Sequence, residues 1–172
     1  NQKEVGLTWG EVEFIYNGVN QLPTATATGL VNNDVCLVTV TGEKVNVGEY
    51  EATASSLSNS NYKLPANVTK GFEIKKAQLT VTANDEEVTY GDQAPIYTVT
   101  YNGFVNNETK EVLGGELSFA CEYEKTSNVG NYDIVASGYT SDNYEITYVN
   151  GSIKVNQKEV GLTWGEVEFI YN

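Results

Sequence analysis

The densest group of chemically capable side chains in the sequence is a run of carboxylates. Asp85, Glu86 and Glu87 are consecutive, and Asp92 follows shortly after them in "NDEEVTYGD". Carboxylate oxygens are preferred ligands of Ca²⁺, which makes this run a weak calcium candidate. It lacks the D-x-[DN]-x-[DN]-G pattern of a calcium loop, so we expect no metal and no other cofactor. A solvated segment that leads from a strand into a turn is the simpler interpretation.

Enzymatic chemistry has little support in this sequence. Paired carboxylates can hydrolyse glycosides, but only across a cleft that fixes their separation, and the short loops of this chain leave no room for one. His is absent, and no nucleophile–base pair or cofactor-binding loop is recognisable. We therefore expect that the protein is not an enzyme.

The two cysteines have no partners of the kind that metal or catalytic sites need. Cys36 lies in "DVCLVTV" and Cys121 in "LSFACEYE", both alternating apolar runs without a C-x-x-C motif. The absence of this spacing excludes a zinc-finger site. A buried structural thiol is the leading interpretation of each, with a disulfide or a reactive site as the alternatives.

Aromatic rings are the remaining candidates for recognition, because sugars stack on exposed rings. The candidates are Trp9, Trp164, Tyr101, Tyr139, Tyr144 and Tyr148. Trp9 shares one predicted strand face with Val5 and Leu7, which favours a place in a core or at a module junction. Weak multivalent binding of mucin-type glycans or host matrix proteins is therefore an alternative function.

The charge of the chain excludes other partners. All of the basic residues are Lys, and the formal net charge is −13. Such a protein repels a phosphate backbone, and no apolar run is long enough to cross a bilayer. We expect neither nucleic-acid binding nor membrane insertion.

The elements that must position these residues are strands. Apolar and polar side chains alternate, with many β-branched and aromatic residues, in residues 35–41, 79–83, 97–101 and 117–123. Helical periodicity is lacking, although residues 103–115 can hold one helical turn. The sequence therefore predicts an all-β protein.

Two short motifs predict local structure. Asn150-Gly151 separates two alternating runs, which is the signal for a tight type I′ hairpin. "NVGEYEATA" and "NVGNYDIVA" place a Gly two residues before Tyr50 and Tyr132. This pattern resembles the tyrosine corner of Greek-key sandwiches, in which the phenol bonds to the upstream backbone. All four residues are predicted to have structural roles.

The chain contains an exact repeat. Residues 156–172 copy residues 1–17 without one change. An identity of this length indicates a tandem array in which residues 1–155 form one unit, with an engineered duplicate as the alternative. Residues 156–172 are then the start of the next unit.

A second, diverged repeat lies inside that unit. Two pairs of segments correspond: "YNGVNQLPTATATGLVNND" with "YGDQAPIYTVTYNGFVNNE", and "NVGEYEATASSLSNSNYKL" with "NVGNYDIVASGYTSDNYEI". Aligning Ile74 with Ile153 divides the unit into module one (residues 1–76) and module two (residues 77–155). No Pro-, Gly- or Ser-rich linker separates the modules, which favours a stiff, elongated array.

Module two resembles a known family. A strand is followed by a Tyr-Gly-Asp turn, a Pro, "NGFVN", "NVGNY" and "NYEI", in that order. This is similar to the MBG-type repeat, YGX variety, of bacterial cell-surface adhesin-like proteins. Module one resembles a relative of the same kind, with Tyr16-Asn17-Gly18 in place of Tyr90-Gly91-Asp92. The resemblance implies an extracellular repeat at the bacterial cell surface or cell wall.

Together these patterns predict the fold and the function. We expect two tandem small Ig-like or Greek-key β-sandwich modules in an elongated array, with a β-grasp-like sheet as the alternative. We expect a structural repeat segment of a bacterial cell-surface protein that forms an adhesin stalk or fibre.

The duplicated end suggests a further function, head-to-tail self-assembly into filaments. Val160, Leu162, Trp164 and Phe169 repeat the apolar positions of the first two strands of the unit. A strand outside a sheet has unpaired backbone N–H and C=O groups and can pair with another chain. The place that residues 1–17 occupy in another copy fits this segment, because the two sequences are identical. Neighbouring copies of the same repeat are therefore the expected partners.

Overall fold

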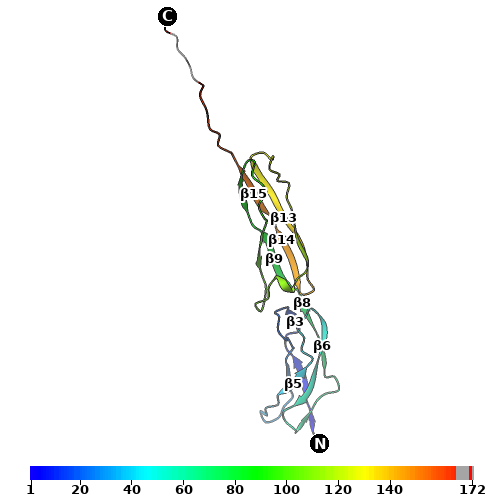
Figure 1. Cartoon of the computed structure of the whole chain (residues 1–172). Coiled ribbons are helices and arrows are strands. Elements are labelled where there is room, and N and C mark those ends of the chain that lie inside the picture. The colour runs from blue at the N-terminus through cyan, green and yellow to red at the C-terminus, as the bar shows by residue number, and fades with distance from the viewer. Residues whose placement is uncertain (166–170, 172) are drawn as a thin grey trace. The chain divides into compact units, whose positions relative to one another are not determined.

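The computed structural model describes residues 1–165 and residue 171, and its regular secondary structure consists almost wholly of strands (Figure 1). The strands of module one are β1 (Lys3–Glu4), β2 (Gly6–Trp9), β3 (Glu13–Ile15), β4 (Ala25–Thr28), β5 (Val38–Thr41), β6 (Gly48–Leu57), β7 (Tyr62–Lys63) and β8 (Thr69–Lys75). Those of module two are β9 (Ala77–Ala83), β10 (Glu86–Thr89), β11 (Val99–Asn102), β12 (Gly114–Ala120), β13 (Gly130–Thr140), β14 (Tyr144–Val149) and β15 (Gly151–Asn156). The prediction of an all-β chain is confirmed.

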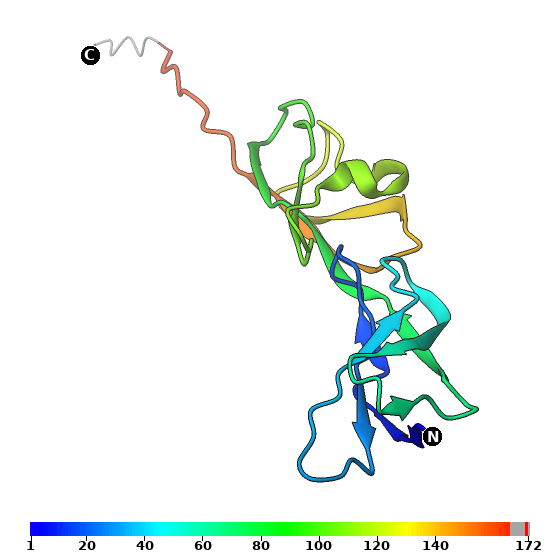
Figure 2. The same ribbon diagram turned by 90° about the horizontal axis from the view of Figure 1, so that it is seen from below.

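One short helical element occurs in the described residues, the 3₁₀ turn η1 (Lys110–Val112), which Figure 2 shows as a coiled ribbon. It lies inside residues 103–115, where one helical turn was expected. Thr109 caps it, because its side-chain oxygen accepts a hydrogen bond from the Glu111 amide.

The two modules build the same sheets from the same strand order. Module one has a four-stranded sheet with the order β3-β8-β6-β5, and module two has a four-stranded sheet with the order β10-β15-β13-β12. In both, the first pair is parallel and β8 or β15 pairs antiparallel with β6 or β13. The remaining strands form the pairs β2-β4 and β1-β7 in module one and the sheet β11-β9-β14 in module two. One fold is therefore used twice.

Strand register corrects the alignment of the two modules. Tyr50 lies opposite Phe72, and its counterpart Tyr132 lies opposite Ile153. Ile153 is therefore equivalent to Phe72 and not to Ile74. The error has a physical cause, because side chains on a strand alternate, and a slip by one full alternation leaves the apolar pattern unchanged.

The core of module one lies between its four-stranded sheet and its two smaller sheets. Its side chains come from both layers. Ala27 on β4 and Tyr62 on β7 belong to the smaller sheets, whereas Val38 on β5 and Leu57 on β6 belong to the four-stranded sheet. Such burial stabilises the fold by about 1.5–3 kcal/mol for each large apolar side chain. In module two every second residue of β9 and β15 is buried, and β13 adds the buried Ile134 and Ala136.

Asn150-Gly151 does not form the predicted hairpin. The strands on either side, β14 and β15, belong to different sheets, and neither residue has the positive φ that a type I′ turn needs. Gly151 is buried, and an added Cβ would lie 2.5 Å from the Ala83 carbonyl oxygen. The glycine permits a close backbone approach where the chain crosses between sheets. A local dipeptide signal cannot separate the two cases, because both place a glycine between alternating runs.

By its internal contacts the chain divides into two compact units. The first comprises Asn1–Val81, Tyr101–Leu117 and Gly138–Thr147. The second comprises Thr82–Thr100, Ser118–Ser137 and the chain from Tyr148 onward. Module one and part of module two therefore belong to the same compact unit.

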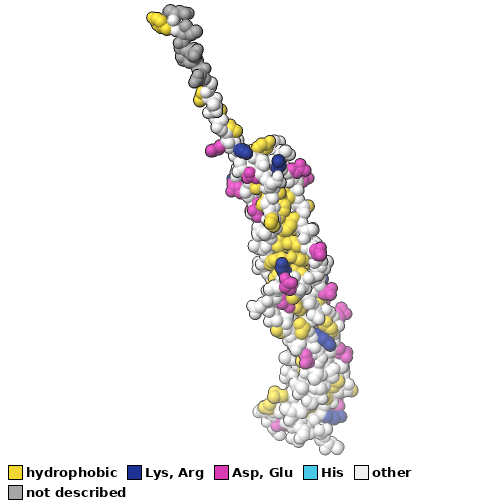
Figure 3. Space-filling view, in the orientation of Figure 1, with side chains coloured by type: hydrophobic (Ala, Val, Ile, Leu, Met, Phe, Trp, Pro, Cys, Tyr) yellow, Lys and Arg dark blue, Asp and Glu magenta, His cyan; other side chains and the backbone are white. Residues whose placement is uncertain are grey.

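Acidic side chains are spread along the visible surface in Figure 3, in keeping with the net charge of −13. Within the described part of the chain, no helix has the length and apolarity needed to cross a membrane.

Candidate functional site

The residues that come together most closely lie in the first compact unit, where two buried tyrosines meet one carboxylate. Tyr16 directly follows β3 and is placed by its amide, which donates to the Lys75 carbonyl over 2.8 Å. Tyr144 begins β14, and the two tyrosines are 5% and 1% exposed. We call Tyr16, Glu108 and Tyr144 the joint, because they connect module one with module two.

A tight turn presents the carboxylate of the joint. Asn106 and Asn107 both adopt left-handed backbone conformations, with φ of 51° and 59°. Asn tolerates this region better than most residues do. The turn closes with a bond of 2.9 Å from the Glu108 amide to the Val105 carbonyl. Its effect is to direct the Glu108 side chain toward the tyrosines.

Each oxygen of Glu108 serves one tyrosine. The Tyr16 hydroxyl donates to Oε1 over 2.6 Å, and the Tyr144 hydroxyl donates to Oε2 over 2.5 Å. Bonds to an ionised acceptor are roughly twice as strong as bonds between neutral groups. The Val105 amide in turn donates to the Tyr144 hydroxyl over 3.0 Å. Both tyrosine hydroxyls and both oxygens of Glu108 therefore have hydrogen-bond partners within the protein.

Ring packing adds to these bonds. Tyr16 and Tyr144 meet edge to face, with centroids 5.4 Å apart and planes at 80°. Phe104 packs on Tyr144 in the same manner at 5.5 Å and 84°. Such pairs contribute about 0.5–1.5 kcal/mol beyond their area. The joint is therefore held by aromatic packing as well as by charge.

The same environment keeps both hydroxyls protonated. Burial, followed by the hydrogen bond to Glu108, raises the pKa of Tyr16 to about 12. Burial and then the bond to Glu108 likewise raise the pKa of Tyr144 to about 12. Both groups therefore act as hydrogen-bond donors throughout the physiological range.

Asparagine amides surround the joint. The Asn106 amide donates to the Gly18 carbonyl over 3.0 Å, and the Asn143 amide donates to the Asn46 side-chain oxygen over 3.1 Å. The Asn143 oxygen accepts from the Val47 amide at 3.0 Å. These contacts link the turns of module one to module two without any charged partner.

Module one contains its own copy of the tyrosine–carboxylate pair. The Tyr62 hydroxyl donates to Asp34 Oδ2 over 2.8 Å and accepts from the Val31 amide at 2.9 Å. Asn32 and Asn33 repeat the left-handed turn, with φ of 53° and 57°. "VNND" and "VNNE" thus build the same feature in both modules. The difference is that Glu108 binds a second tyrosine, supplied by the preceding module.

Sequence reasoning did not bring the residues of the joint together, and it named Tyr144 only as a candidate for sugar stacking, although this residue is 1% exposed. Their signal was present in the paired strings "GLVNND" with "NYKL" and "GFVNNE" with "NYEI". What was missing is the contact itself, since Tyr16 and Glu108 are separated by 92 positions.

The predicted tyrosine corners have the bonds that the motif implies. The Tyr50 hydroxyl donates to the Asn46 carbonyl over 3.0 Å, and the Tyr132 hydroxyl donates to the Asn128 carbonyl over 2.9 Å. A Cβ added to Gly48 would lie 2.7 Å from the Tyr50 hydroxyl oxygen, whereas no atom lies within 4 Å of the Cβ position at Gly130. What the two glycines of the motif share is a positive φ, of 159° and 155°.

Three of the four acids of the weak calcium candidate, Asp85, Glu87 and Asp92, accept hydrogen bonds from protein donors. Asp85 Oδ1 accepts from the Ser152 amide at 2.7 Å, and Asp92 Oδ2 accepts from the Thr89 amide at 3.0 Å. Among the described residues, no group of three or more His, Cys, Asp or Glu is arranged to hold a metal ion. Glu86 is on β10 and partly buried.

Glu87 lies on the exposed face of the same sheet. It pairs with Lys154 at 3.1 Å and accepts from the Asn156 amide at 2.6 Å. The hydrogen bond from Asn156, then the bond and charge of Lys154, lower the pKa of Glu87. Exposed pairs of this kind contribute little to stability.

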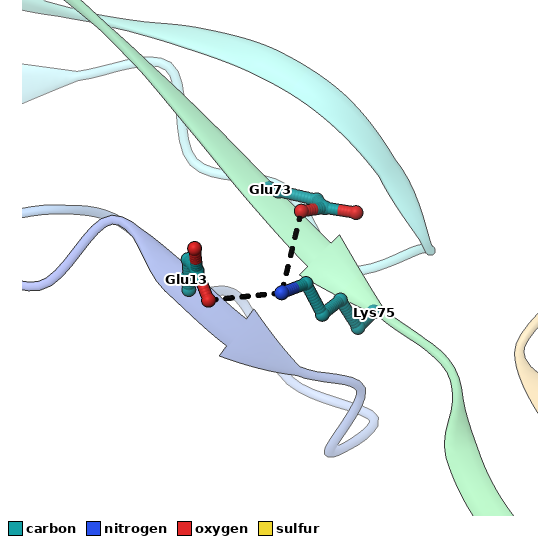
Figure 4. A network of polar contacts seen from close by, with 3 residues as sticks. All are labelled: Glu13, Glu73 and Lys75. Carbon is teal, nitrogen blue, oxygen red and sulfur yellow. Dashed lines mark hydrogen bonds and ion pairs between the residues drawn. The ribbon is translucent and has the colours of Figure 1, made fainter.

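Module one has a comparable exposed ion pair across β3 and β8 (Figure 4), although its lysine, Lys75, is the counterpart of Asn156 and not of Lys154. Lys75 Nζ lies 2.9 Å from Glu13 and 3.7 Å from Glu73. The hydrogen bond and charge of Lys75 lower the pKa of Glu13. The parallel strand pair is thus braced by a cross-strand ion pair in both modules.

Both cysteines are free thiols. Cys36 is buried, as its apolar run predicts, whereas Cys121 is only partly buried. Burial first, and the neighbouring Cys121 thiol second, raise the pKa of Tyr97 to about 12.

The predicted assembly residues are exposed as far as they are described. Val160 and Leu162 are each 79% exposed and Trp164 is 87% exposed, whereas Val5, the counterpart of Val160, is 3% exposed. Phe169 lies outside the described residues. The Val5 position is therefore buried at one end of the chain, and its copy Val160 is exposed at the other.

Comparison with known proteins identifies the modules. No curated protein matches the chain. The family model described as MBG domain (YGX type) matches residues 11–71 and residues 79–154. The two matches cover most of the chain and fall within the two modules seen in the sequence. The chain therefore belongs to the MBG domain family of the YGX type.

Proposed function

We propose that residues 1–155 are one structural repeat of a bacterial cell-surface protein, and that tandem copies form an elongated stalk or fibre that presents an adhesive part. MBG domains are typical repeat domains of bacterial surface proteins. The proposal requires no enzymatic step, no cofactor and no nucleic acid.

The observation that carries the proposal is the joint. A stalk needs connections that resist bending, because flexible linkers let an array shorten toward a random coil. Here the hydroxyls of Tyr16 in module one and Tyr144 in module two both donate to the Glu108 carboxylate, over 2.6 and 2.5 Å. The connection between them, from Lys75 to Ala77, contains no glycine or proline. Such a connection suits a structural repeat better than a flexible binding module.

The test is the way in which size grows with copy number. Small-angle X-ray scattering of proteins with one, two and three copies of residues 1–155 gives their largest dimension. A stiff stalk requires growth in proportion to copy number, and growth with its square root would contradict the proposal. Glu108→Gln in every copy should shift the growth toward the flexible case, and Glu111→Gln, an exposed acid on η1, should not.

A second candidate function is head-to-tail assembly of separate chains through the duplicated ends. What favours it is the exposure of Val160, Leu162 and Trp164 beside the burial of Val5. Neighbouring copies would be the partners. Weak multivalent binding of glycans or matrix proteins stays a prediction from the sequence.

A further inference from the structure

Tyr90 occupies in module two the position that Tyr16 occupies in module one. Both directly follow the first strand of the four-stranded sheet. The Tyr16 amide donates to the Lys75 carbonyl over 2.8 Å, and the Tyr90 amide donates to the Asn156 carbonyl over 2.9 Å. Both acceptors are the residues at which the last strand of the module ends. The two tyrosines are therefore placed identically at the exit of their modules.

The surroundings of the two tyrosines differ. Tyr16 is 5% exposed, because the joint covers it. Tyr90 is 43% exposed. The chain that leaves module two at Asn156 repeats the first residues of module one. In an array, the next structure beyond Tyr90 is therefore another module one.

Module one already carries the receiving half of a joint. Asp34 and Tyr62 are the counterparts of Glu108 and Tyr144, set on the same left-handed asparagine turn. In the joint each carboxylate oxygen receives one tyrosine, and Tyr62 uses only Oδ2 of Asp34. Asp34 is only partly buried. Its position therefore suits a second hydroxyl donor.

Apolar side chains beside this receiving half are also uncovered. Val31 is 43% exposed and Val35 is 73% exposed. Val105, the counterpart of Val31, is partly buried. Covering these side chains would add apolar burial to the hydrogen bond. The preceding module is the partner of matching shape, since the repeat supplies the same two surfaces in each copy.

We infer that Tyr90 and Asp34 form the second joint of the array, in which the Tyr90 hydroxyl of one unit donates to the Asp34 carboxylate of the following unit, beside that unit's Tyr62. The inference rests on the proposed function, because it requires tandem units. It means that the array alternates between a glutamate joint inside each unit and an aspartate joint between units. Each module thus both donates a tyrosine forward and accepts one from behind.

The test is a protein with two consecutive copies of residues 1–155 and a single Tyr90→Phe substitution. In the first copy this removes the hydroxyl that faces the second copy. In the second copy the same substitution faces no following unit, so this variant is a matched control of identical composition. We expect the first-copy variant alone to lower the midpoint of thermal unfolding, by about 2–4 °C.

A third variant identifies the acceptor. Asp34→Asn in the second copy should abolish the further effect of Tyr90→Phe in the first copy, because the two residues share one bond. Equal midpoints for the first-copy and second-copy Tyr90→Phe proteins would overturn the inference. So would a first-copy effect that persists in the Asp34→Asn background.

Scattering by the unsubstituted two-copy protein separates this inference from the stalk proposal. If the two-copy protein is rod-like but Tyr90→Phe has no effect specific to the first copy, the second joint is contradicted and the stalk proposal stands. If the two-copy protein is flexible but Tyr90→Phe lowers the midpoint only in the first copy, the stalk proposal is contradicted and the second joint stands.

Discussion

At the scale of single residues, one carboxylate organises the best-defined site of the chain. Glu108 holds two hydroxyls that come from positions far apart in the sequence. A buried hydrogen bond to a charged group contributes about 1.5–3 kcal/mol, so the loss of either tyrosine leaves an expensive unpaired group. The repeated Asp34–Tyr62 pair shows that this arrangement belongs to the module itself. The second tyrosine adapts it to connect neighbours.

The tyrosines of the joint predict a distinctive behaviour at high pH. Their pKa of about 12 exceeds the ordinary value of 10.0. The folded state therefore binds these protons more tightly, and the stability that they contribute is present below pH 10 and is lost between pH 10 and 12. Tyrosinate absorbance should show a late-titrating group in the folded protein that includes Tyr16 and Tyr144. Tyr16→Phe should remove one late titration, whereas loss of an early one would contradict the assignment.

At the scale of elements, alternation in the sequence predicts strands well and their partners poorly. Residues 79–83 lie within β9, and one turn of helix occurs within residues 103–115, both as expected. Asn150-Gly151 shows the limit, since the flanking strands were recognisable but their separation into two sheets was not. The joint was unpredictable for the same reason. Which strands pair, and which side chains meet, depends on contacts between distant segments that no local pattern encodes.

The crossing at Gly151 gives a prediction about packing. Gly151→Ala places a Cβ 2.5 Å from the Ala83 carbonyl oxygen and 2.8 Å from that of Asn84. Backbone atoms cannot move aside as a flexible side chain can, so we expect a loss of about 1–3 kcal/mol in the free energy of unfolding by urea. Gly161→Ala, where no atom lies within 4 Å, is the control and should change stability by less than about 0.5 kcal/mol. Equal effects of the two substitutions would show that the close approach is absent.

At the scale of the whole molecule, the exact repeat is the feature with the largest consequence. Residues 1–17 contribute β1, β2 and β3 to module one, with Val5 buried and Thr8 exposed. The identical segment at the other end is exposed throughout its described residues from Gln157. Within an array it would continue into a module. In a separate chain, the place of residues 1–17 in another copy already has the shape that fits this segment.

This asymmetry predicts how the mass of the protein in solution depends on concentration. Light scattering should show growth with concentration for residues 1–172 and none for residues 1–155, if the duplicated ends exchange between chains. Val160→Asp should abolish the growth, because the counterpart Val5 is 3% exposed and a buried unpaired charge is strongly unfavourable. Thr163→Asp should preserve it, since its counterpart Thr8 is exposed. Growth that is equal in both variants would assign the association to another surface, and a constant mass for residues 1–172 would leave tandem connection as the sole use of the repeated ends.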